Sequence, residues 1–489
     1  MVTQVPQGGL TSVEQALVEH VGRGEWLDLI PDVPKGEVID GAAMRSWGDS
    51  RTCRAFVIRD ILRGRLAVDI DPHGVRLRGA RIIGQLDLEN LITDVWLELE
   101  DCLLEEGVVA RDARLPGLWL TRCQIEHPAE PPFDGSALSC GMLGLTGARI
   151  IGHTDAGAVE LLAAHVSSRL DCTEMKLCND SGPALDANSL QVGQNMRLSG
   201  EFAGIGAGGA VCLLGAQIGG HLLFDGAQLR NDSGPALLAE SLLVGQHLFL
   251  RWFTATGGGQ GAAVNLKGAQ VGGAFQFAPE RLEHKDDSRR RLAADGLTYA
   301  GVPGRISPED WRELLREGTP EYAAQPYQQL AAGCRALGDD RQARQTLIAQ
   351  RDDQLARAPT RWAERWWGRI TKVTLGYGYQ PWRALWFLAV VVALSCVLAV
   401  VLGSHGALAQ SSLTVTPGRS CTLVQQVSVG LDLNLPVGTS VARSACDLTR
   451  YSSSVTAAWL STVGWILRLL AWVFAALFIA GFTSAVRKT

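Results

Sequence analysis

Apolar residues in the middle of the chain follow two periods at once. Within a segment they fall at even-numbered spacings, as at Ile218, Leu222 and Phe224, which is the pattern of β-strands rather than helices. Between segments a leading aliphatic residue recurs after 26, 26, 26 and 27 residues, at Val166, Val192, Ile218, Val244 and Val271. Short strands, glycine-rich turns and this repeat predict a parallel β-helix (β-solenoid), whose coils bury their apolar faces by stacking on one another.

The repeat is less regular toward the N-terminus. Ile82, Leu115 and Ile150 align with the leading aliphatic residue only at wider intervals, and Val166 follows Ile150 after 16 residues. Either that coil is irregular or the alignment is wrong there, and the handedness of the solenoid also stays open. A leucine-rich repeat is the nearest competing fold, but its asparagine column is missing.

The segments on either side of the repeat have helical patterns. Thr11 to Glu14 has the spacing of a capping box, which opens a helix, and a second helix is expected over Ser50 to Arg63. Two further amphipathic stretches follow the repeat. We therefore assign residues 1–65 to an N-terminal helical cap, 66–285 to the solenoid and 286–360 to a TPR-like helical hairpin that either caps the solenoid or docks a partner.

Two long apolar runs predict membrane spans. Residues 384–403 contain no charge over 20 residues, and residues 469–486 form a second uncharged run after Arg468, whose side chain can extend to the interface. We assign 384–403 and 457–486 to transmembrane helices and 404–456 to an extracytoplasmic loop. Lys and Arg concentrate outside that loop, which predicts a two-pass protein with both termini in the cytoplasm.

Residues 361–383 predict a basic amphipathic segment that lies along the inner membrane surface. Aromatic and aliphatic side chains recur there at helical spacing, with Arg and Lys beside them. The residues expected at the membrane interface are Trp362, Arg365, Trp366, Arg369, Lys372 and Trp382.

Charge and cysteine content narrow the classes further. A net charge of −5 over 489 residues excludes nucleic-acid binding through bulk positive charge. Cys421 and Cys446 are the two cysteines of the predicted outer loop, so a disulfide between them is expected. The cysteines expected in the cytoplasm form no CxxC pair, and we interpret them as buried, reduced core thiols.

Two patterns could carry chemistry. His221 and His247 occupy the same repeat position, so they should stack on one face and either share a Zn or Cu ion or belong to a solvated polar ladder. Gly204, Gly206 and Gly209 form a GxGxxG pattern that is either a dinucleotide-binding loop or a turn between coils. There is no GxSxG or HExxH, so no catalytic residue is assigned, which favours a non-enzymatic role.

Several stretches carry a resemblance to a known family. They include GVRLRGARIIGQLDL from Gly74, QPYQQLAAGCRALGDDRQARQTLIAQRD from Gln325 and GYGYQPWRA from Gly376. Together with the repeats, they resemble an actinobacterial family of membrane-anchored β-solenoid proteins, with a pentapeptide-repeat-like solenoid and a two-span C-terminal tail. Such proteins are often labelled "membrane-associated oxidoreductase". The resemblance implies the bacterial cytoplasmic membrane, but it supplies no catalytic residues.

The expected function is a membrane-tethered cytoplasmic scaffold or protein-interaction module with no cofactor. Its expected partners are the lipid bilayer and a protein bound to the solenoid or the helical hairpin; it is a candidate homo-oligomer, and no nucleic acid is expected. Two alternatives stay open. One is an oxidoreductase, which would require flavin or NAD(P), and the other is an oligomeric membrane effector, sensor or channel.

Overall fold

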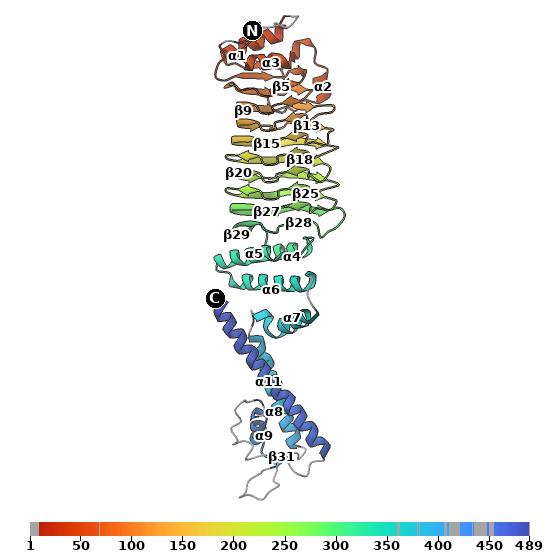
Figure 1. The fold of residues 1–489 in the computed structure, drawn as a ribbon, viewed down its shortest axis with the longest axis vertical. Coiled ribbons are helices and arrows are strands. Elements are labelled where there is room, and N and C mark those ends of the chain that lie inside the picture. The colour runs from red at the N-terminus through yellow and green to blue at the C-terminus, as the bar shows by residue number, and fades with distance from the viewer. Residues whose placement is uncertain are drawn as a thin grey trace. The chain divides into compact units, whose positions relative to one another are not determined.

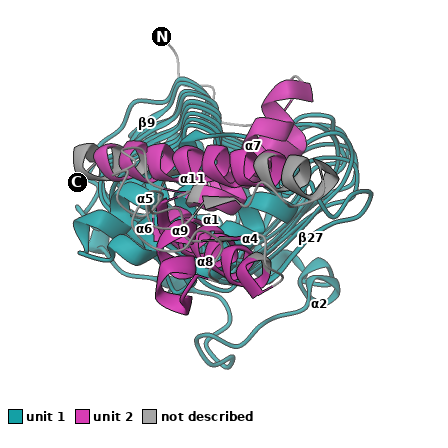
Figure 2. Cartoon of the chain, turned by 90° about the horizontal axis from the view of Figure 1, so that it is seen from below, with its two compact units in different colours: residues 1–347 teal, residues 348–489 magenta. Residues whose placement is uncertain are grey.

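The computed structural model divides the chain into two compact units, Met1–Leu347 and Ile348–Thr489 (Figure 2). It describes residues 9–67, 69–358, 362–378, 380, 382–404, 408–409, 421–432, 434, 447–448 and 454–488. The predicted partner cysteine Cys446 lies outside the described residues.

Unit 1 is a parallel β-solenoid, as the repeat predicts (Figure 1). Within the described residues, one face is a nine-stranded parallel sheet. Its strands are β5 (Leu86–Asp87), β8 (Val108–Val109), β11 (Phe133–Asp134), β14 (Val159–Glu160), β16 (Leu185–Asp186), β19 (Val211–Cys212), β23 (Leu237–Leu238), β26 (Val264–Asn265) and β28 (Leu292–Ala293).

The other faces of the coils form a second parallel sheet, also continuous along unit 1. Its twenty described strands are β1 (Leu27–Asp28), β2 (Thr52–Arg54), β3 (Val75–Arg78), β4 (Arg81–Ile83), β6 (Leu97–Glu100), β7 (Leu103–Leu104), β9 (Arg114–Thr121), β10 (Gln124–Glu126), β12 (Ser139–Gly144), β13 (Arg149–Gly152), β15 (His165–Asn179), β17 (Gln191–Val192), β18 (Met196–Gly204), β20 (Gln217–Ile218), β21 (Leu222–Leu223), β22 (Ala227–Asn231), β24 (Leu243–Val244), β25 (Leu248–Gly257), β27 (Gln270–His284) and β29 (Thr298–Gly304).

The strand register confirms the 26-residue alignment and corrects its N-terminal part. Val166, Val192, Ile218, Val244 and Val271 pair in succession along one column. Leu115 belongs to the same column, because it pairs with Cys140, which pairs with Val166. Ile150 instead pairs with Leu177 in a second aliphatic column. The 16-residue interval is therefore the distance between two columns, not an irregular coil.

A column of glycines lets successive coils approach closely. A Cβ atom built on Gly193, Gly219, Gly245 or Gly272 would lie 2.1 to 2.4 Å from a backbone carbonyl oxygen of the preceding coil. Real Cβ atoms essentially never approach another heavy atom that closely. These positions therefore require glycine through backbone packing.

The N-terminal cap is shorter than predicted because part of it joins the solenoid. Helix α1 (Ser12–Arg23) begins with the expected capping box of Thr11 and Glu14. It is followed by α2 (Gly41–Arg45), the 3-10 turn η1 (Asp49–Arg51) and α3 (Ala55–Leu62). The expected helix from Ser50 does not form at its start, since β2 pairs with β4 and extends the sheet there.

The solenoid also continues beyond the predicted boundary at residue 285. β28 and β29 follow it, and helices begin only with α4 (Pro308–Glu317), α5 (Gln325–Ala336) and α6 (Asp340–Arg357). The charged residues after His284 form a connection between strands, and the buried side chains of Leu292, Leu297 and Tyr299 then return to the core. Trp311 of α4 closes this end against Phe275 and Phe277, with ring centroids 5.9 and 5.3 Å away.

Unit 2 contains two helices long and apolar enough to cross a membrane. They are α8 (Trp382–Ser404) and α11 (Ser454–Lys488), with apolar windows at Trp382–Val401 and Thr462–Ala480. The rings of Phe387 and Phe474 stack between them at 5.4 Å. Arg468 falls inside the second window, where its guanidinium lies 6.0 Å from the ring centroid of Trp465.

Shorter elements surround these helices. They are α7 (Trp362–Leu375), the 3-10 turn η2 (Gly376–Gly378), α9 (Leu423–Asp432) and an antiparallel pair, β30 (Leu408–Ala409) with β31 (Asp447–Leu448). Although α9 belongs to the predicted outer loop 404–456, it packs on α8. A Cβ atom on Gly430 would lie 2.6 Å from the Cα atom of Cys396, and Ser395 Oγ donates to Asn434 Oδ1 at 3.2 Å.

Candidate functional site

The predicted stacking of His221 and His247 is present. Their ring centroids lie 5.0 Å apart with 17° between the ring planes. Asn195 precedes them in the column, and its Oδ1 accepts the backbone N–H of His221 at 2.9 Å. His221 Nδ1 accepts the N–H of His247 at 3.4 Å, and His247 Nδ1 accepts the N–H of Ala274 at 2.8 Å.

These contacts give both histidines a role in a polar ladder, while Nε2 of each ring takes no part in them. A ring nitrogen that accepts an N–H uses the lone pair a metal would need, so Nδ1 of each histidine is occupied by the next coil. The described residues hold no group of three or more His, Cys, Asp or Glu side chains that could bind a metal ion. The column acts as a row of side-chain acceptors for backbone donors.

The glycine pattern at Gly204 lies in a column in which a polar side chain alternates with glycine. The register pairs Gly152 with Asn179, Gly204 with Asn231, and Gly257 with His284. Asn231 Oδ1 accepts the N–H groups of Ser233 and Gly234 at 3.0 and 2.9 Å, and its Nδ2 donates to Gly206 O at 2.8 Å. His284 Nδ1 likewise accepts the N–H groups of the residues two and three positions later.

The GxGxxG segment therefore forms a turn between coils. A Cβ atom on Gly204 would lie 2.8 Å from the backbone nitrogen of Ala184, so glycine leaves room for the neighbouring coil there. Gly206 and Gly209 adopt φ values of +91° and +89°. A dinucleotide loop would open a helix whose N-terminus binds pyrophosphate, but the next element is the strand β19.

Three thiols of unit 1 are held in their neutral form. Burial raises the pKa of Cys53 and of Cys140 to about 12, and that of Cys212 to about 11. Such thiols are poor nucleophiles at neutral pH. In unit 2, Cys421 is disulfide-bonded.

The surface of α7 carries two of the predicted interfacial aromatic residues, Trp362 and Trp366, and also Trp367, which was not predicted. Trp362, Trp366 and Trp367 are 75%, 51% and 62% exposed, and Ile370 and Val373 of the same helix are also exposed. Arg365 and Arg369 are exposed as well. We call the three tryptophans with Ile370 and Val373 the α7 apolar face.

Lys372, which is predicted to lie at the membrane interface, forms an ion pair within unit 2. Its Nζ donates to Asp352 Oδ2 at 2.8 Å, and Tyr377 Oη donates to Asp352 Oδ1 at 2.7 Å. A Cβ atom on Gly368 would lie 2.4 Å from a methyl group of Leu355. These contacts fix α7 against the end of α6 that belongs to unit 2, on the side away from the α7 apolar face.

Comparison with known proteins adds no family to this description. No protein-family model, curated protein or solved structure matches the chain.

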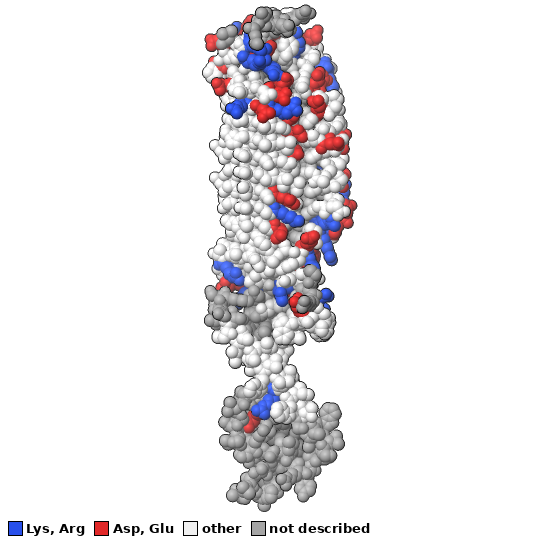
Figure 3. Space-filling model, in the orientation of Figure 1, with Lys and Arg blue, Asp and Glu red and all other residues white. Residues whose placement is uncertain are grey.

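A column of stacked carboxyl groups was missed by the sequence reasoning. Asp134 pairs with Glu160, and Glu160 pairs with Asp186, on successive strands of the nine-stranded sheet. Neighbouring strands lie about 4.8 Å apart, so these groups are close like charges. Figure 3 shows charged side chains gathered along one side of unit 1. Their 26-residue spacing was the available signal.

Burial raises the pKa of Glu160, helped by the charge of Asp134, and burial raises that of Asp186. The folded chain therefore binds these protons more readily than the unfolded chain, and stability falls as the pH rises from the unfolded pKa values through the folded ones. Replacing Glu160 with Gln and Asp186 with Asn is expected to increase the free energy of unfolding at pH 7 by about 1 kcal/mol.

Thermal unfolding of both proteins at pH 7 and near pH 4 measures this effect. The gain should shrink at the lower pH, where the carboxyl groups of the unmodified chain are increasingly protonated. Glu201→Gln is the control, because the Glu201 carboxylate is half exposed and pairs with Lys176 at 3.2 Å. An equal gain at both pH values would contradict the electrostatic explanation.

Proposed function

We propose that this protein is a membrane-tethered cytoplasmic β-solenoid that acts as a non-catalytic scaffold or protein-interaction module in the bacterial cytoplasmic membrane. The observation that carries the membrane part is the exposed apolar surface of unit 2. Only 22% and 11% of the apolar windows of α8 and α11 are buried. Long apolar helices with such exposure are unfavourable in water and favourable in lipid.

The α7 apolar face supports the same proposal. Amphipathic helices with aromatic residues on one side and Arg or Lys beside them bind in the plane of the interface. Trp382 and Trp386 at the start of α8 are 54% and 66% exposed, as expected for side chains at the boundary between lipid and water. Both cytoplasmic termini and the two-pass topology are part of this proposal.

The scaffold part rests on the way the solenoid uses its polar groups. The side chains of the histidine column, and those of the column in which asparagine alternates with glycine, form hydrogen bonds to backbone groups of neighbouring coils. The result is a long, regular surface of the kind that solenoid proteins use to bind partners. Membership of the actinobacterial family, the oxidoreductase activity and the oligomeric effector or channel remain predictions from the sequence.

The membrane proposal predicts that the α7 tryptophans touch lipid. Full-length protein reconstituted in vesicles with brominated lipids should lose part of its tryptophan fluorescence by quenching. Replacing Trp362, Trp366 and Trp367 with Phe should remove a large share of the quenched signal. Trp119→Phe is the matched control, since Trp119 lies in the solenoid strand β9 and should change total fluorescence but not quenching. Unchanged quenching in the triple variant would contradict an interfacial α7.

The scaffold proposal is tested on the same reconstituted protein and, by crosslinking, in cells. We expect no flavin or nicotinamide absorbance and no ion flux across the vesicles, while photo-crosslinkers placed on exposed solenoid positions should capture one recurring protein in cells. A bound redox chromophore that turns over would favour the oxidoreductase. Ion flux would favour the oligomeric channel.

A further inference from the structure

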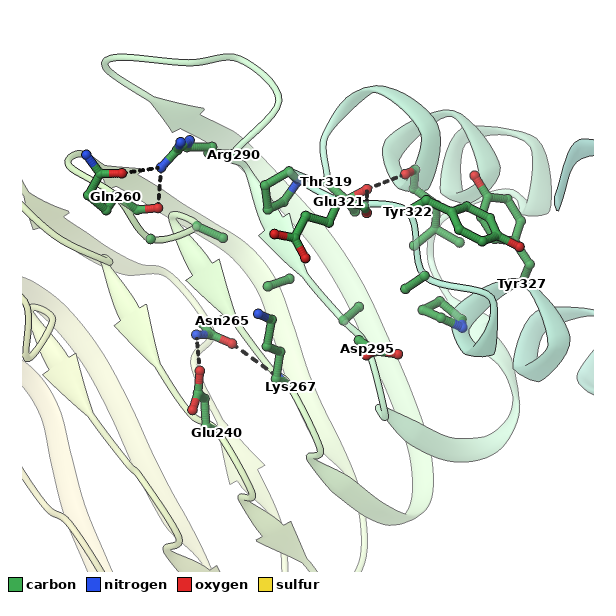
Figure 4. A pocket seen from close by; sticks show the side chains of 18 residues that line it. Glu240, Gln260, Asn265, Lys267, Arg290, Asp295, Thr319, Glu321, Tyr322 and Tyr327 are labelled. Carbon is green, nitrogen blue, oxygen red and sulfur yellow. Dashed lines mark hydrogen bonds between the residues drawn. The ribbon is translucent and has the colours of Figure 1, made fainter. Parts of the chain in front are cut away.

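A cavity of about 540 Å³ lies at the C-terminal end of the nine-stranded sheet, wholly within unit 1 (Figure 4). The last coils form one wall, and the segment between α4 and α5 forms the other. This volume falls in the range of small-molecule sites. Lys267 and Glu321 point into the space between the two walls (Figure 4).

One row of backbone hydrogen bonds leads directly to this cavity. In each coil the residue after the short strand donates its N–H to a carbonyl of the next coil, at 2.6 to 2.9 Å from Ala110 onward. The successive donors are Ala110, Gly135, Leu161, Ala187, Leu213, Ala239 and Leu266. Leu266 donates to Ala293 O at 2.8 Å, so the next donor in the row is the N–H of Ala294.

In the described part of the chain, no further coil follows Ala294 to accept its N–H. The helical segment after the solenoid supplies acceptors for the N–H groups on both sides of Ala294, but not for Ala294 itself. Gly318 O accepts the N–H groups of Arg291 and Leu292, each at 2.9 Å. Gln325 Oε1 accepts the N–H of Gly296 at 3.1 Å. Among the described residues, the N–H of Ala294 has no acceptor, although Ala294 is only 3% exposed. Buried N–H groups without a partner are rare in proteins.

Some of the charged side chains that line the cavity have an ion-pair or hydrogen-bond partner, and others have none among the described residues. Glu240 is held by Asn265 Nδ2 at 2.7 Å, and Arg290 by Gln260 and Asp287. By contrast, no ion pair is formed within the described part of the chain by Lys267, Asp295 or Glu321. Lys267, Asp295 and Glu321 are solvent-exposed. Within the described residues, the site therefore offers an unpaired ammonium group and two unpaired carboxylates at its rim, beside the unused N–H donor.

We propose that this cavity binds a small zwitterion of the amino-acid or short-peptide class. Its carboxylate would accept the N–H of Ala294 and pair with Lys267, which completes the row of hydrogen bonds. Its ammonium group would pair with Glu321. Charge-assisted hydrogen bonds of this kind are stronger than neutral ones, and the two opposite charges of the ligand match the two signs in the wall.

Calorimetric titration of the full-length protein in detergent tests the site with three probes. Glycylglycine should bind with a stoichiometry of one. Its C-terminal amide and its N-acetyl derivative, which each lack one of the two charges, should bind at least tenfold more weakly. Equal binding of all three probes, or no binding of glycylglycine, would overturn the proposal.

Two variants locate the binding in this cavity. Lys267→Met should weaken glycylglycine binding at least tenfold, whereas the control Lys285→Met should not, because Lys285 pairs with Asp232 away from the cavity wall. Ala294→Pro removes the unused N–H and should abolish binding with little change in melting temperature. Ala239→Pro should lower the melting temperature, because that N–H is bonded to Asn265 O at 2.8 Å. Unchanged affinity in Lys267→Met would overturn the assignment even if Ala294→Pro failed to fold.

Discussion

Replacing Gly219 with alanine is expected to destabilise unit 1 by about 3 kcal/mol or more. A Cβ atom there would lie 2.2 Å from the carbonyl oxygen of Gly193 in the preceding coil. That oxygen cannot move aside alone, because it belongs to a backbone hydrogen-bonded on both sides. The two coils would have to separate, and the bonds from Gly219 N to Val192 O and from Gly220 N to Gln194 O, both 2.7 Å, would weaken.

Thermal unfolding followed by circular dichroism measures this effect. Gly48→Ala is the matched control, since its added Cβ atom would meet nothing within 4 Å and its φ is −85°. Alanine at Gly48 should leave the melting temperature nearly unchanged. If the two variants unfolded at the same temperature, the close approach of coils would not be what demands glycine at this column.

Replacing Arg78 with alanine is expected to lower the free energy of unfolding by about 3 to 5 kcal/mol. Arg78 is 1% exposed and joins the first coils to the N-terminal cap. Its Nε donates to Asp101 Oδ2 at 2.9 Å and its Nη1 to Asp28 Oδ2 at 3.0 Å. Its Nη2 also donates to the carbonyl of Val33 at 3.0 Å. Without the guanidinium, the buried Asp101 keeps Arg122 as its one cationic partner among the described residues.

Denaturant unfolding of the variant, with Arg230→Ala as the control, tests this prediction. The side chains of Arg230 and Asp232 are 66% and 45% exposed, and ion pairs of that exposure contribute about 0–1 kcal/mol. If Arg78→Ala lost a similarly small amount of unfolding free energy, the N-terminal cap would be held by its apolar contacts alone.

The register of the solenoid was predictable where its coils have one length. From Val166 to Val271, each aliphatic residue marks the same place in its coil, so the period in the sequence is the period in space. Upstream, Leu115 and Ile150 are both aliphatic, both buried and on different columns. Hydrophobicity alone cannot tell them apart, because a coil buries several strands at once.

The sites were only partly predictable for a related reason. The stacking of His221 on His247 follows from the repeat, but the use of both Nδ1 atoms by backbone N–H groups depends on side-chain rotation. The unused N–H of Ala294 cannot be read from the sequence at all. It arises because, among the described residues, Gly318 after α4 and Gln325 of α5 supply acceptors for Leu292 and Gly296 but no group supplies one for Ala294. This depends on how the helices pack against the last coil.

The alternation of Asn179, Gly204, Asn231 and Gly257 also restricts how this protein can change in length. Each asparagine side chain donates to a backbone carbonyl of the preceding coil, and a Cβ atom on Gly204 or Gly257 would lie 2.8 or 2.6 Å from backbone atoms. Removing one coil would bring two asparagines, or two glycines, into adjacent positions, whereas removing two restores the order. Longer and shorter versions of this solenoid should therefore arise by gain or loss of coil pairs, as in the 52-residue offset between the two NDSGPAL segments.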